Sequence, residues 1–210
     1  DRFLVFGLSK GTVIFISLEN LEQIFSRFSI HRQSVEQIYE MKQSKNMISV
    51  CSELSLCIWG FASGKCQSYK YFQVMRPLTD IKIMNDLVFV GFKTGDTEMF
   101  LWREQEKEFY KLNCEKMDEH EDQLEAVDYL NDQGLFVTGG RDGLVKIWNI
   151  KKELIREIKF PDPITSVLFL NQQGDILVGH IGKVSSVLAA DYKPFEVSDL
   201  TSPPPEELTQ

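Results

Sequence analysis

Hydrophobic and polar residues alternate in short stretches along almost the whole chain, and Gly, Asn, Asp, Ser or Pro separates one stretch from the next. Alternation with a period of two places the hydrophobic side chains on one face of a β-strand. The stretch "NLEQIFSRF" also fits a turn of helix, and we interpret it as a strand. No stretch has strong helical periodicity, so we expect a nearly all-β fold. The predicted strands are Phe3–Gly7, Thr12–Leu18, Glu22–Phe28, Val35–Met41, Met47–Cys51, Leu56–Phe61, Gln67–Phe72, Leu78–Met84, Leu87–Phe92, Glu98–Arg103, Phe109–Cys114, Leu124–Leu130, Leu135–Thr138, Val145–Ile150, Leu154–Phe160, Ile164–Leu170, Asp175–Val178 and Lys183–Ala189.

These strands recur as a repeated unit. Trp102 follows Trp59 by 43 residues and Trp148 follows Trp102 by 46, and each Trp lies in an alternating stretch. Steps of similar size lead back to Ile16 and forward to Val187, which also lie in alternating stretches after a Gly. Each of these five copies holds about four strands, the period of one propeller blade.

The strand before each of these positions has a shared pattern, seen in "FLVFGLSKG", "MISVCSELS", "LVFVGFKTGD", "LFVTGGRDG" and "ILVGHIG". The first copy opens on its second strand, so its innermost strand is expected upstream. We count roughly four and a half blades, whereas closed propellers have about four to eight. The chain is therefore expected to be the C-terminal part of a larger propeller, or to pack against another propeller.

The stretch "HEDQLEAVDYLNDQGLFVTGGRDGLVKIWNI" resembles a WD repeat across its full length. Glu119 stands where the family's Gly-His motif has Gly, and Asn149 stands for the Asp of the Trp-Asp pair. The resemblance implies a hydrogen-bonded network inside one blade, formed by four side chains. These are His120, Thr138, Asp142 and Trp148.

The other copies are weaker. One keeps His31 and Trp59 but has Glu53-Leu54 at its turn, the Trp102 copy has no preceding His and one extra residue, and the outermost copies lack Trp. Blades are expected over residues 1–191. Residues 192–210 are acidic and rich in Pro, which indicates a solvated tail or linker, with a docking segment for a partner as the alternative.

Composition and charge exclude several classes of function. The formal charge is −8, which disfavours a nucleic-acid or anionic-membrane surface, because phosphate binding needs a concentrated basic face. No apolar run is long enough to span a membrane. The four cysteines form no C-x-x-C pair and the three histidines complete no zinc or catalytic set. We expect no cofactor, no metal and no small-molecule substrate, and a reducing intracellular location.

Two motifs could suggest ligand chemistry. "GGRDG" lacks the Gly-Lys-Ser/Thr ending of a phosphate loop and opens no helix, so a β-turn is the better interpretation. The acidic run "EKMDEHEDQLE" does not have the spacing of an EF-hand. It is either a solvated loop or an acidic patch that steers a basic partner.

Any binding surface is expected on the rim formed by the inter-blade loops and the turns between second and third strands. The turns carry Lys10, Glu53, Lys93, Arg141 and Gly182, and the acidic loop adds Glu119, Glu121 and Asp122. These residues are positional candidates for binding a partner.

The class resemblance implies a non-catalytic scaffold that holds other proteins in a complex. The stretch "GDILVGH" followed by "DYKPF" is similar to the closing blade of large WD-repeat proteins of the ciliary axoneme, which implies axonemal or microtubule-associated partners and a cytoplasmic or cytoskeletal location. A peptide-recognition propeller, such as a ubiquitin-ligase substrate receptor or a histone-tail reader, is the alternative. An enzyme propeller would need inward-pointing acids or histidines around its channel.

Overall fold

The structure is a computed structural model, and it describes residues 3–51, 55–62, 65–73, 76–112 and 118–193. These residues form antiparallel β-sheets in chain order, with one short helix, so the predicted all-β fold is confirmed. Contacts divide the chain into two compact units, residues 1–77 with 102–109 and residues 78–101 with 110–210.

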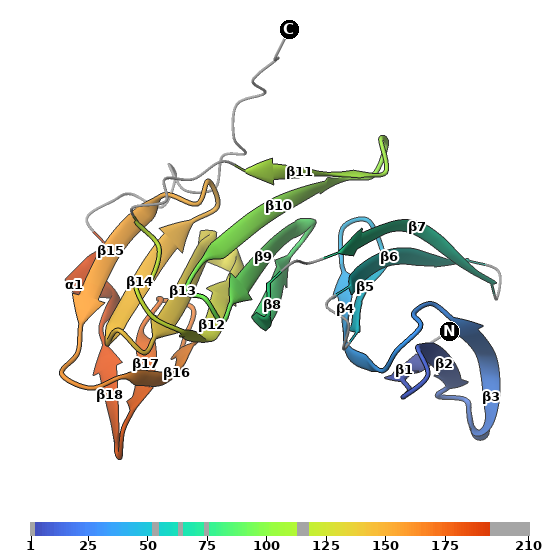
Figure 1. The fold of residues 1–210 in the computed structure, drawn as a ribbon, viewed down its shortest axis with the longest axis horizontal. Helices are drawn as coiled ribbons and strands as arrows, with labels where there is room; N and C mark the ends of the chain where they lie inside the picture. The colour runs from blue at the N-terminus through green and yellow to red at the C-terminus, as the bar shows by residue number, and fades with distance from the viewer. Residues whose placement is uncertain (1–2, 52–54, 63–64, 74–75, 113–117, 194–210) are drawn as a thin grey trace, which may run out of the picture. The chain divides into compact units, whose positions relative to one another are not determined.

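The first unit contains two sheets that follow one another along the chain (Figure 1). The first sheet has the order β1-β2-β3, with β1 (Phe3–Gly7), β2 (Thr12–Ser17) and β3 (Asn20–Ser29). The second has the order β4-β5-β6-β7, with β4 (Val35–Met41), β5 (Asn46–Cys51), β6 (Ser55–Ala62) and β7 (Lys65–Gln73). Neighbouring strands pair antiparallel throughout, as short hairpin connections require.

The next three sheets continue the same meander. The third sheet consists of β8 (Leu78–Met84), β9 (Leu87–Phe92), β10 (Thr97–Arg103) and β11 (Glu108–Leu112), and the end of its last hairpin, Trp102–Phe109, counts with the first unit. The fourth consists of β12 (Leu124–Leu130), β13 (Leu135–Gly140), β14 (Leu144–Asn149) and β15 (Leu154–Lys159). The fifth consists of β16 (Ile164–Phe169), β17 (Ile176–His180) and β18 (Lys183–Val187).

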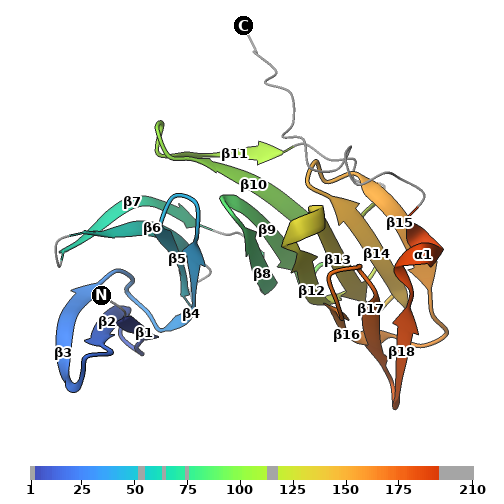
Figure 2. The same cartoon turned by 180° about the vertical axis from the view of Figure 1, so that it is seen from behind.

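Every predicted strand is present, including the one read in "NLEQIFSRF", which is β3. At the last strand the structure differs from the prediction in type as well as in length. The strand ends at Val187 rather than Ala189, and the chain then forms the short helix α1 (Ala189–Tyr192), which follows β18 in Figure 2. Tyr192 is 1% exposed and donates a hydrogen bond to the carbonyl oxygen of Gly174. Burial of one aromatic ring thus accounts for a helix that the period-two pattern did not predict.

The sheets of each unit pack through their apolar faces. In the second unit, one buried cluster lies between the fourth and fifth sheets and includes Val137, Ile147 and Ile164. Another lies between the third and fourth sheets and includes Phe89 and Phe136. In the first unit a third cluster joins the first two sheets. Both faces of β13 are therefore covered, and every residue of β13 and of β9 is buried.

Close approach of the sheets explains two glycines. A Cβ on Gly139 of β13 would lie 2.6 Å from a methyl group of Ile164 on β16, and one on Gly91 of β9 would lie 2.2 Å from a methyl group of Leu124 on β12. Both distances are far shorter than van der Waals contact. Glycine at these positions lets the second strand of one sheet touch the first strand of the next.

Candidate interaction rim

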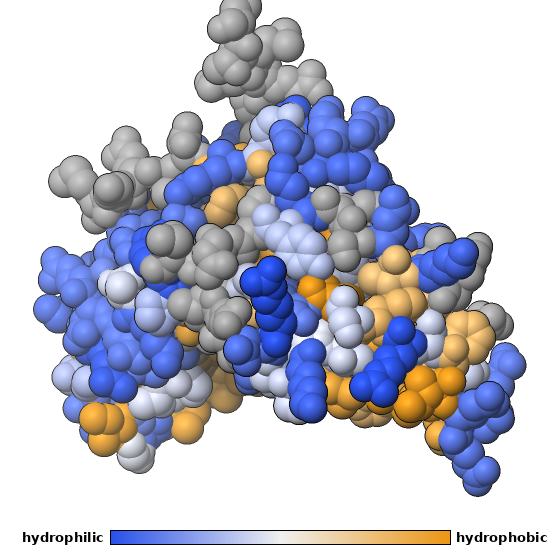
Figure 3. All heavy atoms as spheres, turned by 45° about the vertical axis from the view of Figure 1, so that its right-hand side comes forward, coloured by the Kyte–Doolittle hydropathy of each residue, from blue (hydrophilic) through white to orange (hydrophobic). Residues whose placement is uncertain are grey.

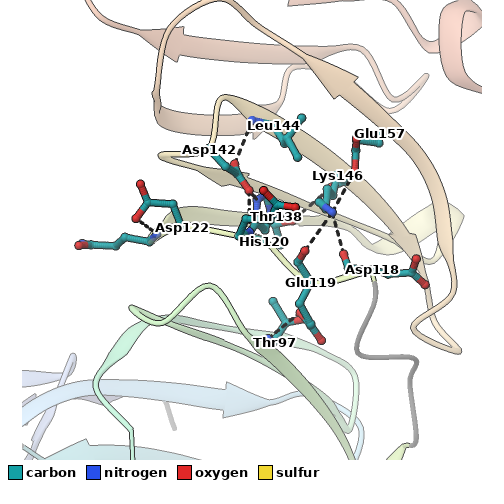
Figure 4. Close-up of polar contacts among 12 residues, drawn as sticks. Thr97, Asp118, Glu119, His120, Asp122, Thr138, Asp142, Leu144, Lys146 and Glu157 are labelled. Atoms are coloured by element: carbon teal, nitrogen blue, oxygen red, sulfur yellow. Dashed lines mark hydrogen bonds and ion pairs between the residues drawn. The ribbon is translucent and has the colours of Figure 1, made fainter.

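The four residues matched to the WD pattern are hydrogen-bonded to one another in the fourth sheet. Figure 4 shows three of them, His120, Thr138 and Asp142. The indole N–H of Trp148 donates to Oγ1 of Thr138 at 2.9 Å, and His120 Nε2 lies 2.9 Å from the same oxygen. His120 Nδ1 lies 2.9 Å from a carboxylate oxygen of Asp142. Thr138 and Trp148 are fully buried.

One donor in this network is fixed by chemistry. An ionised carboxylate can only accept, so His120 Nδ1–H donates to Asp142. The Thr138 hydroxyl lies between His120 Nε2, at 2.9 Å, and the backbone carbonyl oxygen of Lys146, at 3.4 Å. The hydroxyl oxygen in turn accepts from Trp148. Every polar atom of this buried set has a partner, which is the condition under which a buried polar network stabilises a fold.

Asp142 joins this network to the rim. Its carboxylate accepts from the backbone N–H of Glu121 at 3.1 Å and from that of Leu144 at 3.0 Å. Burial acts to raise the pKa of Asp142, but hydrogen bonds and the charge interaction with His120, together with the two backbone donors, outweigh it, so the pKa lies below its ordinary value. The carboxylate therefore stays ionised. It holds residues 118–123, which we call the inter-blade loop, beside the β13–β14 turn.

The second sheet contains a reduced version of the network. His31 Nε2 lies 2.7 Å from Oγ of Ser49, and the indole N–H of Trp59 donates to the same oxygen at 3.1 Å. In place of an Asp, Ser55 Oγ lies 3.3 Å from His31 Nδ1. Burial lowers the pKa of His31, and a hydrogen bond with Ser49 works in the opposite direction. The sequence identified His31 and Trp59 but not the two serines.

Among the residues that the structure describes, the third sheet has no such network, and its Trp does not lie where the repeat pattern predicts. Trp148 pairs with Phe136, the second residue of β13, and Trp59 pairs with Met47, the second residue of β5. The second residue of β9 is Val88, and it pairs with Phe100. Phe100, not Trp102, is thus the counterpart of the other two Trp residues. The indole of Trp102 donates instead to a carboxylate oxygen of Glu104 at 2.8 Å.

In the fifth sheet His180 is the last residue of β17 and is 6% exposed. Its Nε2 lies 2.9 Å from Oγ of Ser185, and its Nδ1 lies 3.4 Å from a carboxylate oxygen of Asp162. His180 is therefore part of the internal packing of this sheet.

Two buried lysines hold the inter-blade loop from beneath. Lys146 Nζ donates to the backbone carbonyl of Asp118 at 2.9 Å and to that of Glu119 at 3.1 Å (Figure 4). Lys152, whose side chain is 0% exposed, donates to the carbonyl of Thr97 at 2.9 Å and pairs with the Glu119 carboxylate. Its ammonium group also lies 5.3 Å from the Trp148 ring centroid.

Glu119 differs from its expected role at the rim. Its side chain is 10% exposed, and one carboxylate oxygen accepts from both the backbone N–H and the hydroxyl of Thr97, at 2.9 and 2.7 Å. A buried carboxylate needs such partners because desolvation is costly. Glu119 is thus an internal tie between the third and fourth sheets of the second unit, and it is not available to a partner as an exposed acid.

Three segments of the second unit meet at the rim. The β9–β10 turn contains exposed Lys93, and at Gly95 in that turn a Cβ would lie 2.5 Å from the carbonyl oxygen of His120. The β13–β14 turn contains Arg141, whose backbone N–H donates to the carbonyl of Gln123 at 2.8 Å. Between these turns runs the inter-blade loop with its exposed acids, Glu121 and Asp122.

The remaining rim candidates are placed as follows. Lys10 is exposed on the β1–β2 turn of the first unit, and Glu53 lies outside the described residues. The guanidinium of Arg141 pairs with Glu125, so its charge is partly balanced locally. We define the interaction rim as Lys93, Glu121, Asp122 and Arg141, the candidates that the second unit brings together.

Within the described ranges, no group of three or more His, Cys, Asp or Glu side chains is arranged to hold a metal ion. Among the same residues, no helix has the length and apolar character needed to cross a membrane.

Sheets of antiparallel strands that follow one another along the chain define an all-β, propeller-like fold. Solved structures with this fold include the computationally designed protein Ika8, with a TM-score of 0.69 and 18% identity over 92% of this chain and 57% of that one. They also include Sqt1 of Saccharomyces cerevisiae, with a TM-score of 0.66 and 12% identity over 91% of this chain and 56% of that one. The chain thus spans a little over half the length of these structures. No protein-family model and no curated protein matches it significantly.

Proposed function

We propose that this chain is a non-catalytic scaffold that binds another protein of a multi-subunit assembly through the interaction rim. The observation that carries the proposal is the support beneath the rim. Buried Lys146 and the Asp142 carboxylate bind the backbone of the inter-blade loop, and buried Lys152 pairs with the Glu119 carboxylate of that loop. Glu121 and Asp122 on the same loop are exposed. A binding surface held in place before association loses less conformational entropy when it binds.

Charge gives this rim its selectivity. Glu121 and Asp122 alternate with Lys93 and Arg141 on neighbouring turns, so a matching partner carries charges of both signs at set spacing. Complementary charges at the edge of an interface mainly affect the association rate and the choice of partner. Reversal of one such charge is expected to weaken binding by about 1 kcal/mol, roughly fivefold.

The test compares two charge reversals in the same sheet. Glu121→Lys changes the rim, whereas Asp132→Lys changes an exposed acid in the loop at the opposite end of β12. Tagged chains carrying either change are purified from ciliated cells, and the co-purifying proteins are quantified against the unchanged chain. We expect Glu121→Lys to deplete a defined set of partners that Asp132→Lys retains. Equal recovery with both variants would contradict a role for the rim.

We further propose that the assembly is the ciliary axoneme, on the resemblance of the last blade to axonemal WD-repeat proteins. Imaging of the tagged full-length protein in ciliated cells tests this location. Signal along the cilium with co-purified microtubule-associated proteins is the expected result. Enrichment on chromatin without ciliary signal would overturn the axonemal part and favour a histone-tail reader, while the rim variants test the scaffold role independently.

A further inference from the structure

A break in strand pairing opens a hollow in the first sheet. Ser17 of β2 pairs with Asn20 of β3, but the preceding residue Ile16 pairs with Ile24. Residues 21–23 therefore have no partner on β2 and form a bulge. Bulges of this kind redirect side chains and interrupt the regular surface of a sheet, and they recur beside functional sites.

The hollow has a volume of about 310 Å³ and combines an apolar floor with polar walls. Phe3, Ile24 and Phe25 supply its apolar surface, and Ile24 and Phe25 are each 51% exposed. Half-exposed apolar side chains beside a concave surface are typical of binding sites. Figure 3 shows exposed hydrophobic side chains as orange patches on the surface.

The floor of the hollow is rigid because it belongs to an aromatic cluster that continues into the core. The Phe3 and Phe25 ring centroids are 4.9 Å apart, and Phe61 lies 5.8 Å from Phe3. Phe61 is stacked on buried Phe15 at 4.3 Å. Rings locked in this way cannot collapse into the hollow without disturbing the packing of the unit.

The polar walls leave one charge for a ligand. Ser17 Oγ accepts from the backbone N–H of Glu19, and Asn20 Oδ1 accepts from that of Glu22, so each of these two oxygens already has a donor within the turn. Gln23 adds an uncharged amide to the walls. Glu19 is the sole charged residue that lines the hollow, and the described residues provide it with no salt-bridge partner. A complementary ligand is therefore apolar with an adjacent positive charge.

We propose that this hollow binds a short basic segment of another protein, which inserts one aliphatic or aromatic side chain against Phe3 and Phe25 and places a Lys or Arg beside Glu19. The volume lies at the lower end of the range for ligand pockets, about 300–1,000 Å³, and so suits one or two side chains. Among the described strands none pairs with the outer edge of β3, which leaves the approach to the hollow open. This site is separate from the interaction rim and does not depend on it.

The test uses a defined probe, the peptide acetyl-Gly-Arg-Leu-Phe-Arg-Gly-amide, added to the isotopically labelled full chain and followed by NMR. A second peptide replaces Leu-Phe with Ser-Ser at the same charge, and a third replaces both Arg with Glu. We expect the first peptide to shift the methyl resonance of Ile24 and the amides of Ser17 and Asn20. The second and third peptides should bind at least fivefold more weakly.

Matched variants locate the site. Ile24→Gln and Glu19→Lys should each weaken binding of the first peptide at least fivefold. Leu21→Gln and Glu22→Lys, which change an equally exposed apolar residue and an acid that do not line the hollow, should leave binding unchanged. Thermal unfolding of the four variants checks that the first unit remains folded.

Three results would overturn the proposal. The Ser-Ser peptide could bind as well as the Leu-Phe peptide, which would reveal charge attraction alone. The shifts could fall on another face, or the control variants could weaken binding as much as the site variants. Finally, the hollow's resonances could shift with protein concentration and no peptide, which would assign this surface to contact between two copies of the chain.

Discussion

Replacement of Thr138 by Val tests how far the buried network stabilises the fourth sheet. Valine has nearly the same shape as threonine but has no hydroxyl, so the change removes hydrogen bonds without opening a large cavity. Thr138 is fully buried, and its oxygen is the meeting point of His120 and Trp148. The change would leave the Trp148 indole N–H and the His120 Nε2 without partners.

The expected cost follows from those two atoms. Each buried polar group left without a partner costs about 1–3 kcal/mol, so two groups cost about 2–6 kcal/mol. Removal of the threonine hydroxyl from a buried site and the gain of a methyl group return about 1 kcal/mol. We expect Thr138→Val to destabilise the fourth sheet by about 3 kcal/mol.

The measurement has to be local, because a chain with two compact units does not have one well-defined unfolding free energy. Hydrogen exchange of the β13 and β14 amides, measured by mass spectrometry, gives the opening free energy of this sheet. The control is Thr165→Val on β16, an exposed threonine that donates to the Gly179 carbonyl at 3.1 Å. An exposed change of this kind should cost no more than about 0.5 kcal/mol.

A double-mutant cycle separates the hydrogen bond from side effects of the substitution. In the Trp148→Phe background, the indole N–H is already gone, so Thr138→Val orphans one atom rather than two. Its cost should then fall by about 1–2 kcal/mol. A cost for Thr138→Val no larger than that of the control, or one unchanged in the Trp148→Phe background, would refute the network as a source of stability.

Three further predictions concern the loop and turns of the second unit. The pKa of Asp142 is lower in the folded state than its ordinary value of 3.8, so the ionised carboxylate stabilises the fold fully above that value. This stabilisation is lost as pH falls through the folded pKa. Hydrogen exchange of the β13 amides, followed during acid titration, should show the loss in the unchanged chain and not in the Asp142→Asn variant. Lys152→Met leaves the Glu119 carboxylate buried without its ion pair and should lower the opening free energy of β14, measured by hydrogen exchange, by about 3–5 kcal/mol. The double variant with Glu119→Gln should recover part of this loss, and no recovery would contradict the pairing. Gly95→Ala should speed hydrogen exchange in its own hairpin far more than Gly182→Ala does in its hairpin. Both residues have positive φ, but a Cβ at Gly95 would clash with backbone carbonyls, whereas nothing lies within 4 Å at Gly182. Equal effects would contradict this packing.

Local sequence patterns predicted the strands because each strand has its own period-two alternation and its own turn residues. The residues of the His120 network could also be found, since the spacing of a single blade repeats a known pattern. The Trp102 prediction was wrong for a physical reason. Spacing along the chain includes hairpin length, whereas structural equivalence is set by strand register, and register puts Phe100 opposite Val88.

Contacts between sheets could not be predicted from the sequence pattern. Nothing in the pattern of "VKIWNIKKE" indicates that Lys146 and Lys152 are buried while Lys151 between them is not fully so. Their burial depends on the carbonyls of Asp118 and Thr97 and on the Glu119 carboxylate, which come from other segments of the second unit. Glu119 could not be separated from the exposed acids around it, because the run has no period that marks an inward face.

The uneven distribution of the network indicates what holds the blades together. The fourth residue of the second strand is Thr138 in the fourth sheet and Ser49 in the second, but Val90 in the third. The third sheet is nevertheless complete, and β9 is buried along its whole length. Apolar packing of sheet faces is therefore sufficient to form a blade, and the hydrogen-bonded network adds to it. Among the described sheets, the fourth alone combines the full network with two buried lysines that bind its inter-blade loop. It follows that the fourth sheet presents the most firmly positioned part of the rim.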